Sequence, residues 1–198
     1  KKKILVAGGT GYIAQPTVEL QNAGYEVVII DDLSNSNIEV LDGIEKITGI
    51  RPGYPIGSKD KEGLQGIGAH PGIKGIILFA ASKAVGESVQ QPLKYYRNNI
   101  VTLVNLLEMM PEFNIEGIVF SSSCTVYGQP DPENLPVTEN APIKPAMSPY
   151  GNTKQINEEI IRDTIHAGAP FKSIILRYFN PIGAHPSAEI GELPNGVP

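Results

Sequence analysis

Short apolar runs recur along the chain and have the length of β-strands. They are rich in β-branched residues and almost continuous, which is typical of strands that are buried on both faces. We therefore predict five strands, at Lys3–Ala7, Glu26–Ile30, Gly75–Phe79, Gly117–Phe120 and Ser173–Leu176.

Helical spacing separates these runs. One set of large apolar residues recurs at steps of three and four, which predicts a long helix with one buried face: Leu93, Tyr96, Ile100, Leu103, Leu107 and Met110. A second amphipathic stretch predicts a helix from about Ser148 to Ala167. Strand and helix in alternation favour right-handed βαβ units. The expected fold class is α/β, a Rossmann-type doubly wound parallel sheet with helices on both faces.

Two segments break this rhythm. The stretch from Arg51 to Lys74 is crowded with glycine and proline, so we expect a weak third strand followed by a loop. The proline-rich segment from Pro130 to Pro149 predicts a long surface loop. In open α/β sheets such loops lie over the ligand crevice.

Composition narrows the class of protein. The 198 residues are 41% hydrophobic and 19% charged, with a net charge of -5, which excludes a disordered chain and a coiled coil. No apolar run approaches the roughly 20 residues of a membrane span, and no Lys/Arg cluster suggests a nucleic-acid surface. The single cysteine, Cys124, forms no internal disulfide and favours a reducing, cytoplasmic compartment. The three histidines have no metal-ligand spacing, so we expect no metal.

A glycine-rich turn follows the first predicted strand, in the order Gly8-Gly9-Thr10-Gly11-Tyr12-Ile13-Ala14. Glycines at the start of such a turn allow a pyrophosphate to approach the backbone at a helix N-terminus. Asp31 and Asp32 come about 20 residues later, after the second strand, where a carboxylate accepts hydrogen bonds from ribose hydroxyls. The pattern favours dinucleotide binding, with NAD preferred over NADP, against a turn that serves packing alone.

A second group of residues has side chains of the types that transfer protons in enzymes. Tyr150 and Lys154 are four residues apart on a predicted helix, which places phenol and ammonium on one face. A nearby ammonium lowers the pKa of a phenol and makes it a usable base. Three serines, Ser121 to Ser123, stand at the carboxyl end of a predicted strand, where active sites of such sheets lie. The alternatives are a surface pair and a strand end that satisfies its own loop.

Together these motifs resemble the UDP-glucose 4-epimerase (UDP-galactose 4-epimerase) branch of the extended short-chain dehydrogenase/reductase family. The resemblance covers nearly the whole chain. Besides the glycine turn and the Tyr150 and Lys154 pair, it rests on Lys83-Ala84-Val85-Gly86-Glu87-Ser88, Asn98-Asn99, Ser121-Ser122-Ser123-Cys124-Thr125-Val126-Tyr127-Gly128 and Arg177-Tyr178-Phe179-Asn180-Pro181-Ile182-Gly183-Ala184-His185.

The resemblance implies roles for individual residues. Tyr150 is the general base, Lys154 lowers its pKa and holds the nicotinamide ribose, and Ser123 hydrogen-bonds the sugar 4′-hydroxyl. The implied NAD-binding residues are Gly8, Gly11, Tyr12, Ile13, Asp31, Asp32, Asn35, Phe79, Ala80, Ala81, Lys83, Asn98, Ser121, Tyr150, Lys154 and Tyr178, with Asn99 along the cofactor. The implied substrate-binding residues are Lys83, Ser123, Thr125, Tyr150 and Asn180.

The implied reaction interconverts UDP-galactose and UDP-glucose. Tyr150 takes the proton of the 4′-hydroxyl while NAD takes the hydride from C4, and the hydride then returns to the opposite face of the 4-keto sugar. The resemblance also implies a homodimer formed through two helices, for which the faces of Leu93 to Met110 and Thr153 to His166 are the candidates. Cys124 is interpreted as a packing residue and not as a nucleophile.

The chain departs from the family pattern in several places. Ala14 and Pro16 alter the glycine turn, Gly57-Ser58 replaces the pair that recognises adenine, and Leu78 stands at a common histidine position. We expect residues 1–180 to form the NAD-binding domain with the catalytic residues, and residues 181–198 to begin a truncated substrate-binding region. The expectation is an intact catalytic apparatus with a deficient sugar-nucleotide site, and low or absent turnover.

Two other functions stay open at this point. A sugar-nucleotide 4,6-dehydratase shares the fold, the Tyr150 and Lys154 spacing and NAD. Such an enzyme needs an acidic residue beside the active-site hydroxyl, and Ser123-Cys124-Thr125 has none. A non-catalytic NAD-binding domain is the second alternative.

Overall fold

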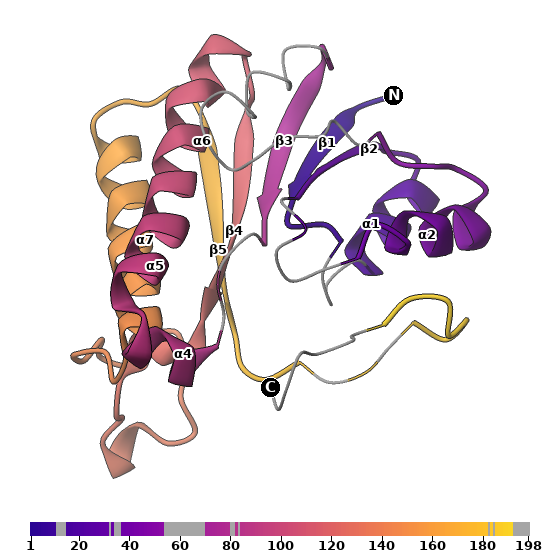
Figure 1. Cartoon of the computed structure of the whole chain (residues 1–198). Coiled ribbons are helices and arrows are strands. Elements are labelled where there is room, and N and C mark those ends of the chain that lie inside the picture. Colours follow the sequence, from indigo (N-terminus) through magenta and orange to yellow (C-terminus); the bar gives the residue numbers. More distant parts are fainter. Residues whose placement is uncertain are drawn as a thin grey trace.

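The fold is a parallel sheet covered on both faces by helices, as shown by the computed structural model in Figure 1. The structure describes residues 1–10, 15–31, 33, 37–53, 70–79, 82, 84–181, 183 and 185–191. Within them, the five strands are all parallel and lie in the order β2-β1-β3-β4-β5. The predicted Rossmann-type class is confirmed.

The strands lie close to where the apolar pattern puts them. Strands β1 (Lys3–Ala7) and β2 (Glu26–Ile30) have the predicted bounds. Strand β3 is Ile73–Leu78, β4 is Gly117–Ser123 and β5 is Lys172–Tyr178. The last two extend beyond their apolar runs because they pair with each other residue by residue up to Ser123 and Tyr178. Cross-strand pairing therefore carries three polar serines into the sheet.

The order of the strands reverses at β1. The chain passes from β1 to β2 on one side and then returns to place β3 on the other side of β1. In open α/β sheets, ligands bind outside the carboxyl ends of the strands at such a reversal. Beyond β2, Gly53 forms one parallel bridge with Val28, in which the Ile29 amide donates to the Gly53 carbonyl at 2.7 Å. This isolated bridge is what the described residues show of the expected weak third strand, and residues 54–69 lie outside the described part.

Two apolar cores fill the space between the sheet and its helices. Neighbouring residues of β1 and β2 point to opposite faces, so Leu5 and Val28 join one core while Val6 and Val27 join the other. Helices α1 (Gln15–Asn22) and α2 (Val40–Thr48) cover one face, and α6 (Thr102–Glu112) and α7 (Pro149–His166) cover the other (Figure 1). None of the described helices is long and apolar enough to cross a membrane.

The predicted long helix is built in several parts. Helix α4 (Val85–Gln90) precedes α5 (Pro92–Tyr96), which continues through a π-helical turn (Arg97–Val101) into α6. A π turn holds more residues than an α turn, so the buried face before it is displaced relative to the face after it. Leu103 is buried as predicted, but Leu93 is 80% exposed and Tyr95 takes the buried position. The prediction of one continuous apolar face is wrong for Leu93.

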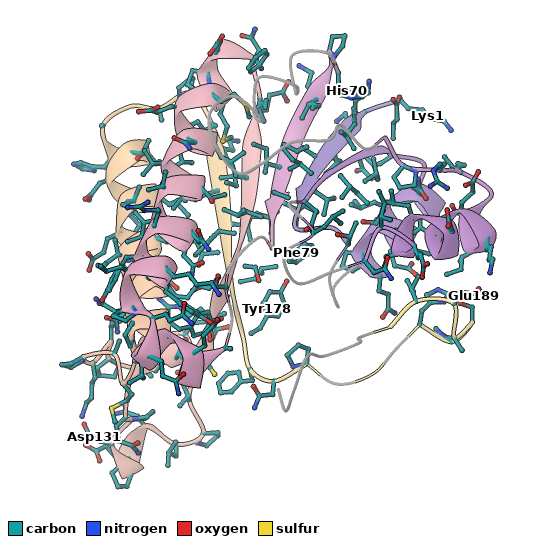
Figure 2. The ribbon with its side chains drawn as sticks, viewed as in Figure 1. Lys1, His70, Phe79, Asp131, Tyr178 and Glu189 are labelled. Carbon is teal, nitrogen blue, oxygen red and sulfur yellow. The ribbon has the colours of Figure 1, made fainter. Side chains whose placement is uncertain are left out.

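The segment after β5 returns toward α2, on the other side of the molecule (Figure 1). Ile190 is buried in the core formed by α1 and α2. Glu189, labelled near α2 in Figure 2, pairs with Lys46 at 3.1 Å. A Cβ added at Gly43 would lie 2.5 Å from the Glu189 carbonyl oxygen, so this close packing requires glycine in α2.

Candidate active site

The start of the glycine turn, Gly8 to Thr10, and Asp31 meet at the carboxyl ends of β1 and β2. Gly8 has a φ of +84°, which favours glycine, and its amide donates to the Ile30 carbonyl at 2.8 Å. A Cβ on Gly9 would lie 2.9 Å from Ile29 Cγ2, so the turn packs against β2 without room for a side chain. The Asp31 carboxylate accepts hydrogen bonds from the Thr10 amide at 3.3 Å and the Leu33 amide at 2.9 Å.

This geometry fits the adenosine half of NAD. The turn offers close backbone approach at the end of β1, and a carboxylate stands beside it at the end of β2, which is the donor and acceptor set that pyrophosphate and ribose require. Besides Lys83, seven of the expected cofactor-binding residues lie outside the described residues: Gly11, Tyr12, Ile13, Asp32, Asn35, Ala80 and Ala81. The same holds for Lys83, expected at both cofactor and substrate, and for Gly57 and Ser58.

Lys154 lies under the carboxyl end of β4 and is only 3% exposed. Helix α7 brings it there, with Ser148 as N-cap accepting a hydrogen bond from the Gly151 amide at 3.1 Å. The Lys154 ammonium donates to the Ser121 carbonyl at 2.6 Å and lies 4.9 Å from the centre of the Phe120 ring and 5.7 Å from that of Tyr150. The burial of Lys154 therefore excludes the alternative that Tyr150 and Lys154 form a pair on the surface. Burial lowers the pKa of Lys154 to about 8.

Tyr150 and Ser123 complete this side of the site. Burial raises the pKa of the Tyr150 phenol, while a hydrogen bond with Ser123 acts to lower it. The sequence predicts a lowered pKa for Tyr150, and the structure shows a raised one. The loss of water around the buried phenol raises the pKa by more than the hydrogen bond with Ser123 lowers it. The Ser123 hydroxyl also accepts from the Thr125 amide at 3.2 Å and the Thr125 hydroxyl at 3.0 Å. Ser123 thus caps its own loop and contacts Tyr150 as well.

Asn99, in the π turn, ties the loop after β3 to α7. Its Oδ1 accepts from the Ser82 amide at 2.9 Å, and its Nδ2 donates to the Ser82 carbonyl at 3.2 Å and to the Thr153 hydroxyl at 3.1 Å. Neighbouring Asn98 donates to the Ser82 hydroxyl at 3.4 Å. The pair of asparagines was expected near the cofactor, but the clamp on Ser82 and Thr153 was not, because it joins segments far apart in the sequence.

The other expected residues lie at the same end of the sheet with different exposure. Phe79 directly follows β3 and Tyr178 ends β5 (Figure 2), and both are half-buried. Asn180, expected to contact substrate, is exposed. Cys124 is a half-buried free thiol. Groups of histidine, cysteine and carboxylate able to hold a metal ion are absent from the residues that the structure describes.

Sequence reasoning missed one charged residue of this site. Glu158 is 2% exposed and accepts hydrogen bonds from Ser122, Arg177 and Arg162. Its place four residues after Lys154 on the same helix was a usable signal, because that spacing puts both side chains on one face.

A family model described as "NAD dependent epimerase/dehydratase family" matches residues 4–196. The chain belongs to this family.

Relatives within the family share a large part of the sequence. The chain is 49% identical over 197 residues to a UDP-glucose 4-epimerase of Bacillus subtilis, and 46% identical over 202 residues to UDP-glucose 4-epimerase 2 of Arabidopsis thaliana. These matches cover 98% and 100% of this chain but 57% of each relative. The chain therefore spans a little over half the length of the curated relatives it matches.

Solved structures of the family agree with the fold. A UDP-glucose 4-epimerase from Bifidobacterium longum, in complex with NAD+ and UDP, matches with a TM-score of 0.94 at 41% identity, over 100% of this chain and 59% of that one. A UDP-glucose 4-epimerase from Stenotrophomonas maltophila, with bound NAD and formylated UDP-arabinopyranose, matches with a TM-score of 0.93 at 42% identity over the same shares. The family likeness thus includes the arrangement of the sheet and helices in space.

Proposed function

We propose that this chain carries the NAD-binding and catalytic part of a UDP-glucose 4-epimerase, which interconverts UDP-galactose and UDP-glucose. The observation that carries the proposal is the buried Lys154 ammonium beside Tyr150 and Ser123 at the carboxyl end of β4. The match to UDP-glucose 4-epimerases over almost the whole chain supports the substrate class. Residues 1–180 are proposed as the NAD-binding domain and 181–198 as the start of the substrate-binding region.

Each side of the site has its own task. The Gly8 turn and Asp31 bind the pyrophosphate and the adenosine ribose, while Lys154 and Tyr150 hold the nicotinamide ribose. NAD, when bound, supplies the acceptor and donor of the hydride at sugar C4. Tyr150 takes the proton of the 4′-hydroxyl, Ser123 orients that hydroxyl, and the charged Lys154 stabilises the phenolate. Because burial raises the pKa of Tyr150, its phenolate needs a nearby positive charge to form. The Lys154 ammonium supplies that charge and offsets the cost of burying the anion.

Two further features belong to the proposal. The thiol of Cys124 is free, which supports a cytoplasmic location.

Helices α4 and α5 and the π turn expose large apolar side chains, Val89 at 62%, Leu93 at 80% and Val101 at 48%, as a homodimer through these helices requires. Light scattering should show a dimer that Leu93→Asp converts to monomer. Met147→Asp, at a loop residue 74% exposed, should leave the dimer intact.

Cofactor content is the test of the proposed function. The purified protein is denatured, and the supernatant is assayed for NAD, with a calorimetric NAD titration if none is released. We expect about one NAD per chain or a titratable affinity, and then low but measurable conversion of UDP-galactose to UDP-glucose. Bound NAD without conversion would favour a non-catalytic NAD-binding domain. The proposal would be overturned if the protein released no NAD and also bound none in the titration.

A further inference from the structure

Among the described residues, two charged side chains are buried: Lys154, 3% exposed, and Glu158, 2% exposed. They carry opposite charges and lie one helical turn apart on the inner face of α7. Removing a charge from water is costly unless an opposite charge and hydrogen bonds compensate it. A buried ammonium followed one turn later by a buried carboxylate is therefore a compensated arrangement.

Glu158 connects α7 to both strands at this side of the sheet. Its Oε1 accepts from the Ser122 hydroxyl at 2.6 Å, and its two oxygens accept from Nε and Nη2 of Arg177 at 3.0 and 2.7 Å. Arg177 in turn donates to the Tyr127 hydroxyl at 3.0 Å. A two-point contact between guanidinium and carboxylate fixes orientation as well as charge.

Each of the three serines of β4, Ser121 to Ser123, contacts a different residue of α7 at the end of that strand. The Ser121 carbonyl accepts from Lys154, the Ser122 hydroxyl donates to Glu158, and the Ser123 hydroxyl bonds with Tyr150. Strand β3 pairs with β4 only as far as Phe120, so these three residues have a described strand partner on the β5 side alone. Glu158 holds the end of β4 from α7 at the point where its ladder to β3 stops.

We propose that Glu158 is a positioning residue for Tyr150 and Lys154: its carboxylate anchors the end of β4 through Ser122 and keeps the Lys154 ammonium charged. The idea rests on the proposed function for its catalytic meaning, but its physical content concerns the chain without ligand. The charge of Glu158 raises the pKa of Lys154 against the lowering caused by burial. Without it, more of the lysine would be neutral at physiological pH.

Other titratable groups surround the pair. On α7, Tyr150 lies beside Lys154, and Arg162 pairs with Glu158. From β5, Arg177 faces Glu158, and from the short helix Cys124–Tyr127, Tyr127 bonds Arg177, while Cys124 interacts with Tyr150. From α5, Tyr95 interacts with Tyr150 and donates to Glu87. Among these groups, Glu158 is the carboxylate whose charge acts on Lys154.

The experiment measures the titration of Lys154 by NMR, with ¹³C at lysine Cε, in the complete chain without NAD or sugar nucleotide. The Lys154 signal is assigned by its loss in Lys154→Met. In Glu158→Gln we expect the pKa of Lys154 to fall by about one unit. Glu159→Gln is the matched control, because it removes the neighbouring carboxylate, which is exposed. Equal Lys154 titrations in both variants would overturn the charge role.

A reciprocal measurement covers the case in which Glu158→Gln fails to fold. Coupling between two sites is equal from either side, so in Lys154→Met the pKa of the Glu158 carboxyl should rise relative to the unaltered chain. An unchanged Glu158 titration would contradict the charge role.

Ser122→Ala tests the anchoring role without changing any charge. The amide signals of Ser121 and Ser123 should shift and their hydrogen exchange should accelerate, while the Lys154 titration is retained. Unchanged amides would overturn the anchoring role. All three readings are made without cofactor or substrate, so a chain that failed to bind NAD would refute the proposed function and leave this inference standing.

Discussion

The two halves of the site are built by opposite means. At the ends of β1 and β2, the start of the glycine turn depends on its backbone and on having no side chains, since Gly9 has no room for a Cβ and Gly8 has a positive φ. At the ends of β4 and β5, the catalytic half is made of side chains, with a buried ammonium and a buried carboxylate on one helix. Under the proposed function, the first half binds the cofactor through close backbone approach and the Asp31 carboxylate, and the second half controls where protons reside.

The difference predicts that the two halves fail in different ways when altered. A change in the turn should cost stability and cofactor affinity, because its task is packing. A change at Lys154 should cost chemistry while the fold survives, because Glu158 keeps its ion pairs with Arg162 and Arg177 when the ammonium is removed.

The largest expected effect is the loss of turnover in Lys154→Met. Without the ammonium the Tyr150 phenolate lacks its charge partner, and we expect epimerisation to fall by about 10²- to 10⁴-fold. The conversion of UDP-galactose measures the rate, calorimetry the NAD affinity, and circular dichroism the fold. Wild-type rates in this variant would show that the contact seen between ammonium and β4 has no part in catalysis.

The next effect is on the pH dependence of stability. Lys154 has a pKa of about 8 in the folded chain and an ordinary value of 10.5. Between these values the unfolded state binds more protons, so the contribution of Lys154 to stability rises with pH. We expect the free energy of unfolding of the wild type, relative to Lys154→Met, to rise by about 2 kcal/mol from pH 8 to pH 10. Urea unfolding at several pH values measures it, and a constant difference contradicts it.

Gly9→Ala tests the turn. The added Cβ would lie 2.9 Å from Ile29 Cγ2 and 3.0 Å from Val6 Cγ1, inside a closely packed contact. We expect a loss of about 1–3 kcal/mol in urea unfolding, with the Lys154 titration unchanged. Gly86→Ala in α4 is the matched control, since its Cβ would meet nothing within 4 Å and helical alanine is favourable. A Gly9→Ala chain as stable as the control would show that the turn can relax.

The smallest expected effect is that of Asp31→Asn. The substitution keeps one oxygen, which can accept from only one of the Thr10 and Leu33 amides because they donate to different oxygens of Asp31, and it removes the charge that favours ribose hydroxyls. Because hydrogen bonds to charged groups contribute about 1.5–3 kcal/mol and neutral ones about half as much, NAD affinity in calorimetry should fall by roughly tenfold. Asp42→Asn, at an exposed residue of α2, should leave the affinity unaltered.

Local pattern was sufficient where neighbours in sequence decide the structure. The bounds of β1 and β2 follow from apolar runs, and Ser148 with Pro149 marks the start of α7. The spacing of Tyr150 and Lys154 placed them on one helix face in advance. The class of fold was predictable for the same reason, because alternating strands and helices leave few ways to build a sheet.

Tertiary structure decided the features that depend on contacts between distant segments. The exposure of Leu93 follows from a π turn, the extension of β4 from its pairing with β5, and the hydrogen bonds of Asn99 from the meeting of the π turn, the loop after β3 and α7. The direction of the Tyr150 pKa shift was likewise decided by burial, which no spacing reveals. Sequence determined which groups could share a face, whereas the packed fold determined how much water each group lost and which partner replaced it.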